Sequence, residues 1–308
     1  MAEVICVGSA VLDHVYEVPS LASDAGTIFA HGYRQTGAGD GANAAVAISR
    51  LGGSAVLWSR LGDDASGDLI VADLVRYGVD ISNLRRSVGA QSPLSSVIAA
   101  ADGRRQATRF PGIGLPADAD GLPFGRIQDA SAVLAEPGWP EAAQRGLDAA
   151  REHRIPAVLA IGITAAPLPE ALSRSATHLL FAPDELLRFT GRTDTGDALV
   201  AAAAKAGVPV CVSSGHDGLR WCKPDETPQA VPPLAIDLVD PAGSWETLCA
   251  AFALAIGEEK PFDTAVAFAV TAASLAGTSR GTRDAMPDRR RVWQQIAIDF
   301  PAIAEADG

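Results

Sequence analysis

The residues best placed to do chemistry lie in one short segment, residues 239–247, with the sequence VDPAGSWET. We interpret it as the end of a strand, a turn of small residues and the start of the apolar helix LCAAFALAI. A helix N-terminus leaves backbone N–H groups unpaired, and such groups suit a phosphate or a developing anion. Glu246 lies in the first helical turn, where it could take a proton from a substrate hydroxyl. The segment therefore predicts an anion site beside a carboxylate base.

Segments typical of strands and helices alternate along the rest of the chain. Strands are predicted at residues 3–8, 55–60, 132–134, 157–161, 179–181 and 208–213. Helices are predicted at residues 41–51, 65–77, 140–153, 184–189 and 195–206. Strands separated by helices of this length indicate a parallel sheet with helices on both faces.

Two stretches, about 14–36 and 94–112, interrupt this alternation because they read as extended segments with no helix between them. We expect them to pair as a small sheet outside the main one, and we expect residues 113–126, rich in Gly, Pro and Asp, to form a loop. The whole chain, residues 1–308, is predicted to be a single domain. An exposed sheet surface favours burial against a second copy, so a homodimer through the small sheet is expected.

Composition limits the partners and the compartment. The formal net charge of −12 over 308 residues argues against nucleic acid and anionic membrane surfaces. It is compatible with a phosphorylated ligand, which local backbone dipoles can bind. The four cysteines form no CxxC pair, which favours a reducing compartment. Without a basic segment at the start or an apolar run long enough to span a bilayer, a cytoplasmic protein is expected.

Five motifs occur in a fixed order between residues 4 and 285. GSAVLD at residues 8–13 matches G-x-x-x-x-D, and AGDGANAA at 38–45 resembles GGxxxN-x-A. LGDDASG at 61–67 resembles GxDxxG, and VSSGHDG at 212–218 fits VTxGxxG. DPAGSWE at 240–246 stands in the place of DTxGAGD. Together these motifs resemble the ribokinase-like (PfkB) family of sugar and nucleoside kinases.

This resemblance implies a Rossmann-like, three-layer α/β domain with a central, mostly parallel sheet and a small β lid. The lid would close over a sugar, and ATP would lie across the carboxyl edge of the sheet. The implied substrate-binding residues are Asp13, Gly39, Asp40, Asn43 and Arg109. The implied nucleotide-binding residues are Ser213, Gly215, Gly218, Ala242 and Gly243.

The implied reaction moves the γ-phosphate of ATP to a primary hydroxyl of a sugar or related polyol. Glu246 would be the catalytic base, and the backbone of Gly243, Ser244 and Trp245 would stabilise the transferring group. A magnesium ion would bridge the phosphates near Glu185.

Several of these catalytic positions depart from the family pattern. Trp245 replaces a glycine, Glu246 an aspartate, Pro241 a threonine and Ala182 the asparagine of NxxE. Glutamate keeps the carboxylate but moves it by a methylene, and a displacement near 1 Å can cost about 100-fold in rate. Tryptophan cannot cheaply adopt the dihedrals open to glycine. A sugar kinase is the leading hypothesis; a non-catalytic sugar- or nucleotide-binding pseudokinase and a nucleoside kinase are the alternatives.

Each of these residues also has a purely structural interpretation. Asp13 could be a turn residue, Asn43 a helix cap and Arg109 an exposed charge. Glu246 could do no more than complement the helix dipole, and Trp245 could be a packing residue. The geometry of the folded chain distinguishes these interpretations.

Overall fold

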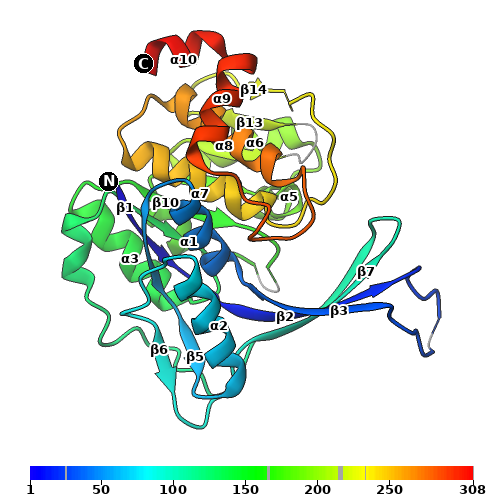
Figure 1. Ribbon diagram of the computed structural model, residues 1–308. Helices are drawn as coiled ribbons and strands as arrows, with labels where there is room; N and C mark the ends of the chain where they lie inside the picture. The colour runs from blue at the N-terminus through cyan, green and yellow to red at the C-terminus, as the bar shows by residue number, and fades with distance from the viewer. Residues whose placement is uncertain (25, 165–166, 214–217, 233, 308) are drawn as a thin grey trace.

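A computed structural model describes residues 1–24, 26–164, 167–213, 218–232 and 234–307. Its main body (Figure 1) is built on an eight-stranded sheet, whose strand order is β14-β13-β12-β11-β10-β9-β1-β4. The strands are β1 Glu3–Val7, β4 Ser54–Trp58, β9 Ala132–Ala135, β10 Ala157–Ile161, β11 His178–Phe181, β12 Val210–Ser213, β13 Leu219–Cys222 and β14 Gln229–Val231. All neighbours from β12 to β4 pair in parallel, whereas β13 and β14 add antiparallel pairs at one edge.

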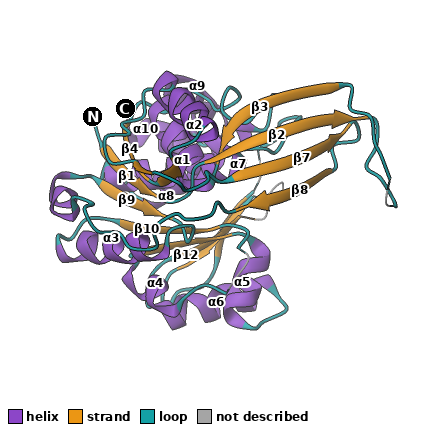
Figure 2. Cartoon of the chain, turned by 90° about the horizontal axis from the view of Figure 1, so that it is seen from below, coloured by secondary structure: helices purple, strands orange, loops and turns teal. Residues whose placement is uncertain are grey.

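Helices cover both faces of this sheet (Figure 2). One layer holds α1 Asp40–Arg50, α2 Ala65–Arg76, α7 Ser244–Gly257, α8 Phe262–Ala276, α9 Arg289–Asp299 and α10 Pro301–Asp307. The other holds α3 Pro140–Glu152, α4 Glu170–Ser175, α5 Pro183–Thr190, α6 Thr195–Ala206 and the 3-10 helix η1 Phe124–Asp129. The three-layer α/β architecture predicted from the sequence is confirmed.

The central strands are apolar along their whole length because both of their faces are buried. In β1, Val4 and Cys6 pack into the core on one side of the sheet, while Ile5 and Val7 pack into the core on the other. Each of these four side chains is 0% exposed. Continuous apolar runs of this kind are typical of parallel strands covered by helices.

A second sheet of four strands, which we call the lid sheet, projects from the main body (Figure 2). Its order is β3-β2-β7-β8, and its strands are β2 Val11–Val18, β3 Gly32–Ala38, β7 Leu94–Ala100 and β8 Arg105–Phe110. The predicted small sheet outside the central one is confirmed, and it comes from the two extended stretches identified in the sequence. The short strands β5 Arg60–Gly62 and β6 Arg85–Ser87 form a separate parallel pair.

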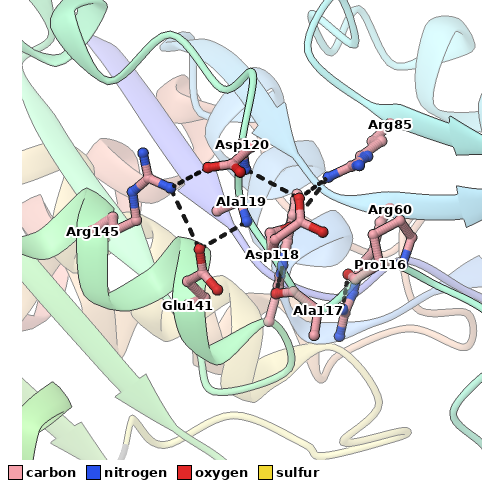
Figure 3. A network of polar contacts seen from close by, with 10 residues as sticks. Arg60, Arg85, Pro116, Ala117, Asp118, Ala119, Asp120, Glu141 and Arg145 are labelled. Atoms are coloured by element: carbon pink, nitrogen blue, oxygen red, sulfur yellow. Dashed lines mark hydrogen bonds and ion pairs between the residues drawn. The ribbon is translucent and has the colours of Figure 1, made fainter.

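The predicted loop at 113–126 is irregular until it enters η1, and polar contacts hold it in place (Figure 3). Arg85 Nη1 donates to Asp118 Oδ1 at 2.8 Å, which ties the loop to β6. The backbone N–H of Ala119 donates to Glu141 Oε1 at 3.1 Å, which ties it to the first turn of α3. The Arg60 guanidinium donates to Pro116 O on the loop and, at 3.3 Å, to Gly138 O. The loop is therefore braced against the chain that follows β9.

One local prediction was wrong: no strand ends at Val239. Residues 236–241 are irregular, and the N–H groups of Val239 and Asp240 both donate to Gly277 O, at 2.8 and 3.0 Å. Val239 is 54% exposed, so it does not lie at a covered position of the sheet. Within the described ranges, no helix is both long and apolar enough to span a bilayer.

Candidate active site

Most of the predicted acceptor and catalytic residues meet at the carboxyl edge of the central sheet. Asp13 lies on β2 just after the end of β1, Asp40 and Asn43 lie in the first turn of α1, and Glu246 lies in the first turn of α7. This edge is where open α/β sheets bind their ligands, because the loops after the strands converge there.

The start of α1 depends on a glycine at position 39. Gly39 is the N-cap with φ +96°, and a Cβ built there would lie 2.6 Å from Ser9 O. The N–H of Ala42 donates to the same oxygen at 3.0 Å. The helix therefore begins directly against the turn that joins β1 to β2, and this contact presents Asp40 and Asn43 to the site.

The start of α7 depends in the same way on Gly243. This residue is the N-cap with φ +82°, and an added Cβ would lie 2.9 Å from Thr282 Cγ2. The Ser244 N–H donates to Pro241 O at 3.2 Å. The N–H groups of Gly243, Trp245 and Glu246 donate to no group in the part of the chain that the structure describes. These unpaired donors at a helix N-terminus suit an anion.

Trp245 does not strain this turn, contrary to the expectation from its bulk. It is the second residue of α7 and has no positive φ, so only Gly243 uses the left-handed region here. Its indole reaches toward the chain after β10, since a Cβ added at Gly162 would lie 2.9 Å from Trp245 Nε1 and 2.8 Å from Asp40 Oδ2. Trp245 also packs partly against the core. It therefore forms a wall of the site without distorting the helix start.

Glu246 is held by the predicted acceptor residue Asn43. Asn43 Nδ2 donates to Glu246 Oε1 at 2.9 Å, and the Asn43 side chain is only 3% exposed. The other amide atom, Oδ1, accepts a hydrogen bond of 2.9 Å from Arg283 Nε. Asn43 is therefore more than a helix cap: it links the first turns of α1 and α7. A carboxylate fixed beside unpaired N–H groups can accept a proton while a neighbouring anion is stabilised.

Several carboxylates crowd into the same space. Burial raises the pKa of Asp13, although the hydrogen bond from Ser95 and the charge of Arg109 lower it. Burial also raises the pKa of Asp40 well above its usual range, and the neighbouring Glu246 and Glu136 carboxylates add to this effect. Arg109 on β8 is paired with Ser95 on β7, and Ser95 is paired with Asp13 on β2. Paired residues point to the same face of a sheet, so Arg109 faces the acids.

Glu136 is a site residue that the sequence reasoning missed. It directly follows β9 and is 8% exposed. Its Oε1 accepts from the Ser9 N–H, and its Oε2 accepts from the Gly138 N–H at 2.5 Å. The available signal was an acid after the apolar run AVLA, at the sheet edge where Asp13 also lies. These two backbone N–H groups hold the Glu136 carboxylate beside the predicted acceptor residues.

Arginines from outside the quoted motifs also enter the site. Arg105 on β8 donates through Nη2 to both Asp240 oxygens, each at 2.7 Å, and Asp240 Oδ1 accepts from the Ala242 N–H at 3.0 Å. The lid sheet therefore contacts the turn that precedes α7. Arg283 contacts Asn43 from the segment between α8 and α9.

The predicted nucleotide residues lie further along the same edge. Ser213 ends β12, which is three strands from β9 in the sheet order, and Gly218 precedes β13 with φ +86°. Gly215 lies outside the described residues. Ala242 and Gly243 belong to the turn that leads into α7.

The predicted metal residue Glu185 is buried and already has partners. The Thr164 N–H donates to its Oε1 at 3.2 Å, the Thr164 hydroxyl donates to its Oε2 at 3.1 Å, and Arg188 pairs with it at 3.3 Å. Among the described residues, no three His, Cys, Asp or Glu side chains form a metal cage. A single carboxylate would suit a magnesium ion only if phosphates and water supplied most of the ligands of that ion.

Comparisons with known proteins agree with this geometry. Residues 1–289 match the family model described as pfkB family carbohydrate kinase. A ribokinase of Arabidopsis thaliana is 30% identical over 311 residues, covering 96% of this chain and 81% of that protein. A solved structure assigned as a ribokinase, from Agrobacterium tumefaciens, has a TM-score of 0.92 at 30% identity, covering 96% of this chain and 98% of that one. The Arabidopsis thaliana ribokinase solved with ribose and ATP has a TM-score of 0.85 at 28% identity, covering 96% and 98%.

Proposed function

Because this chain belongs to the pfkB family of carbohydrate kinases, we propose that it transfers the γ-phosphoryl group of ATP to a primary hydroxyl of a sugar or related polyol. The observation that carries the proposal is the hydrogen bond from Asn43 Nδ2 to Glu246 Oε1. It fixes a carboxylate between the acceptor residues and the unpaired N–H groups of α7. The solved ribokinase complex with ribose and ATP supports this choice of ligands.

In the proposed reaction the acceptor lies against Asp13, Gly39 and Asn43, and Asp40 and Glu136 contribute further hydrogen-bond acceptors. Sugar hydroxyls are donors, so carboxylates that line a pocket can bind several of them at once. Arg109, on the lid face that carries Asp13, faces the same space and suits an acidic group or a hydroxyl oxygen of the acceptor. The crowding of carboxylates favours a polyhydroxylated acceptor.

Glu246 takes the proton of the acceptor hydroxyl through Oε2, because Asn43 uses Oε1. The N–H groups of Gly243, Trp245 and Glu246 stabilise the charge on the transferring phosphoryl group. Ser213, Gly218 and Ala242 hold the nucleotide at the same sheet edge. Glu185 would help to hold a magnesium ion carried by the phosphates, and that ion would supply neutralisation of the remaining negative charge.

The test is an ADP-release screen with Mg·ATP over sugars, sugar acids and nucleosides. It compares the unaltered protein with Glu246→Ala and with Glu152→Ala, an exposed glutamate on α3. We expect a sugar or polyol to be turned over by the unaltered protein and by Glu152→Ala but not by Glu246→Ala. Turnover of nucleosides alone would make the protein a nucleoside kinase. Sugar binding without turnover of any acceptor would make it a pseudokinase.

We further propose that the chain is one domain whose lid sheet covers the acceptor and pairs with a second copy. The ion pair between Arg105 and Asp240 supports closure of the lid onto the site. The opposite face of the lid sheet carries Tyr16, Tyr33 and Phe110, which are 37%, 56% and 37% exposed. Exposed aromatic side chains on one sheet face favour association, and sedimentation analysis of Tyr33→Lys tests it by loss of the dimer.

We also propose a reducing, cytoplasmic location. The four cysteines are free, and all of them are buried. Four unpaired thiols in one fold are typical of proteins from reducing compartments.

A further inference from the structure

Arg283 is a buried cation that is linked to the proposed base through Asn43. Its side chain is 2% exposed, and it lies in the segment between α8 and α9. Its Nη1 forms an ion pair with Asp73 on α2, and its Nη2 donates to Ala38 O at 3.3 Å. A Cβ at position 37 would overlap Nη1, so Gly37 provides the space that the guanidinium occupies. Burying a charge is costly unless it is paired, and here all three nitrogens have partners.

The third partner of Arg283 is the amide that holds Glu246. Arg283 Nε donates to Asn43 Oδ1 at 2.9 Å. A guanidinium has donors only, so the Asn43 amide must turn its oxygen toward Arg283. The Nδ2 group must then face Glu246 Oε1, where it donates at 2.9 Å. Removal of Arg283 would allow the amide to turn over and present its oxygen to the carboxylate, where it would repel Glu246.

We propose that Arg283 is a positioning residue for Glu246: through Asn43 it fixes the carboxylate with Oε1 bound, which leaves Oε2 for the acceptor hydroxyl. This inference rests on the proposed role of Glu246 as the base. It assigns no contact between Arg283 and the substrate, because Asn43 separates the guanidinium from the carboxylate.

The charges in the site agree with this arrangement. The positive charge of Arg283 lowers the pKa of Asp13, and the negative charges of Asp73 and Glu246 raise that of Arg283 against the lowering effect of burial. Arg283 therefore places a positive charge on the far side of the Asn43 amide that orients the Glu246 carboxylate.

The first test uses Arg283→Met, which keeps much of the length and removes the charge and the donors. The Glu246 carboxylate is followed by carbon-13 NMR against pH, and its signal is assigned by its absence from Glu246→Gln. We expect the midpoint to rise by about one pH unit, since a nearby opposite charge has been removed. An unchanged midpoint overturns the proposal, and this readout needs no turnover.

The second test measures kcat and KM against pH with Mg·ATP, and D-ribose is used as the probe acceptor because ribose is the sugar in the solved Arabidopsis thaliana ribokinase complex. We expect kcat to fall about 10- to 100-fold, with KM changed less than threefold and the acidic limb of the profile moved to higher pH. A loss of thermal stability with an unmoved profile would show a merely structural role. Arg126→Met is the control, because it removes another arginine that forms ion pairs, with Glu3 and Asp80, at the opposite edge of the sheet.

A double variant guards against misfolding of the single one. Arg283→Met with Asp73→Leu removes the buried charge together with its partly exposed partner, which costs less stability than leaving one of them unpaired. It should reproduce the NMR and kinetic changes of Arg283→Met. If the unaltered protein turns over no acceptor while the Glu246 midpoint still moves, the proposed function fails and the positioning role stands. If the unaltered protein turns over an acceptor and the midpoint does not move, the proposed function stands and the positioning role fails.

Discussion

Shortening Glu246 to aspartate tests whether its carboxylate is placed by the contacts seen in this structure. The Asn43 Nδ2 to Glu246 Oε1 distance is 2.9 Å. Removing one methylene withdraws the carboxylate by up to about 1.5 Å, the length of one C–C bond. The distance would then exceed about 4 Å, which is beyond hydrogen-bonding range.

The expected cost has two parts. Asn43 is 3% exposed and would lose a hydrogen bond to a charged group, which contributes about 1.5–3 kcal/mol. A base displaced by about 1 Å loses on the order of 100-fold in rate. Trp245 fits the helix start without backbone strain, so a shorter acid at position 246 would relieve no strain there. We therefore expect Glu246→Asp to lower kcat about 100-fold and to reduce thermal stability.

The assay is ADP release with D-ribose and Mg·ATP, with Glu152→Asp as the control for a general effect of the substitution. A rate for Glu246→Asp equal to or above that of the unaltered protein would refute this reasoning. Such a gain, especially if Trp245→Gly increased it, would mean that the present site is a weakened form of the family's catalytic site.

Three further substitutions test the charges of the site and the core. Asp13→Ala should weaken D-ribose binding about tenfold by calorimetry, because a buried group loses its partner; an unchanged Kd would reject the assignment. Burial raises the pKa of Asp40, so the folded state binds this proton more tightly than the unfolded state does. The resulting stabilisation is present at low pH and is lost as pH rises through the raised pKa. Asp40→Asn should accordingly increase the melting temperature at pH 8 and leave it unchanged at pH 3.5. Burial lowers the pKa of His178 from 6.5 to about 4, so its neutral ring favours the fold above pH 6.5. As pH falls from 6.5 through 4, the free energy of unfolding decreases by about 3 kcal/mol. Urea unfolding should show that His178→Phe removes this pH dependence.

The central strands could be predicted closely because burial on both faces leaves a continuous apolar run. The predicted strand at 157–161 coincides with β10, and the predicted helix at 195–206 coincides with α6. The helix α6 also has clear end signals, since Asp194 caps its start and Gly207 adopts φ +67° after its end. Where local propensity and tertiary packing agree, the sequence alone is sufficient to predict an element and its bounds.

The prediction around Val239 was wrong because an apolar pair before a turn does not specify a strand. Val239 and Asp240 satisfy their N–H groups on Gly277 O, a contact that depends on the position of α8. The helices α8, α9 and α10 were not predicted at all. The helix α8 is buried on nearly all sides, so its apolar residues show no clear 3.6-residue period.

The motif positions predicted the first turns of α1 and α7 as parts of one site, but not the side chains that support them. Asn43 and Arg283 are separated by 240 residues, and Arg105 and Asp240 by 135. Contacts over such separations have no local signature, because only the folded sheet edge brings their segments together. Trp245 was misjudged for a related reason: the residue type suggested strain, whereas the helix start needs a positive φ only at Gly243.

The most direct test of the central claim, that Glu246 is the base at the N-terminus of α7, is phosphoryl transfer from ATP to D-ribose by Glu246→Gln. The amide keeps the size of the side chain and removes its basicity. We predict that kcat falls about 10²- to 10⁴-fold. D-ribose binding measured by calorimetry should stay within about threefold, since the Asp13 side of the pocket is untouched. A Glu246→Gln variant that phosphorylates D-ribose at the unaltered rate would contradict the account.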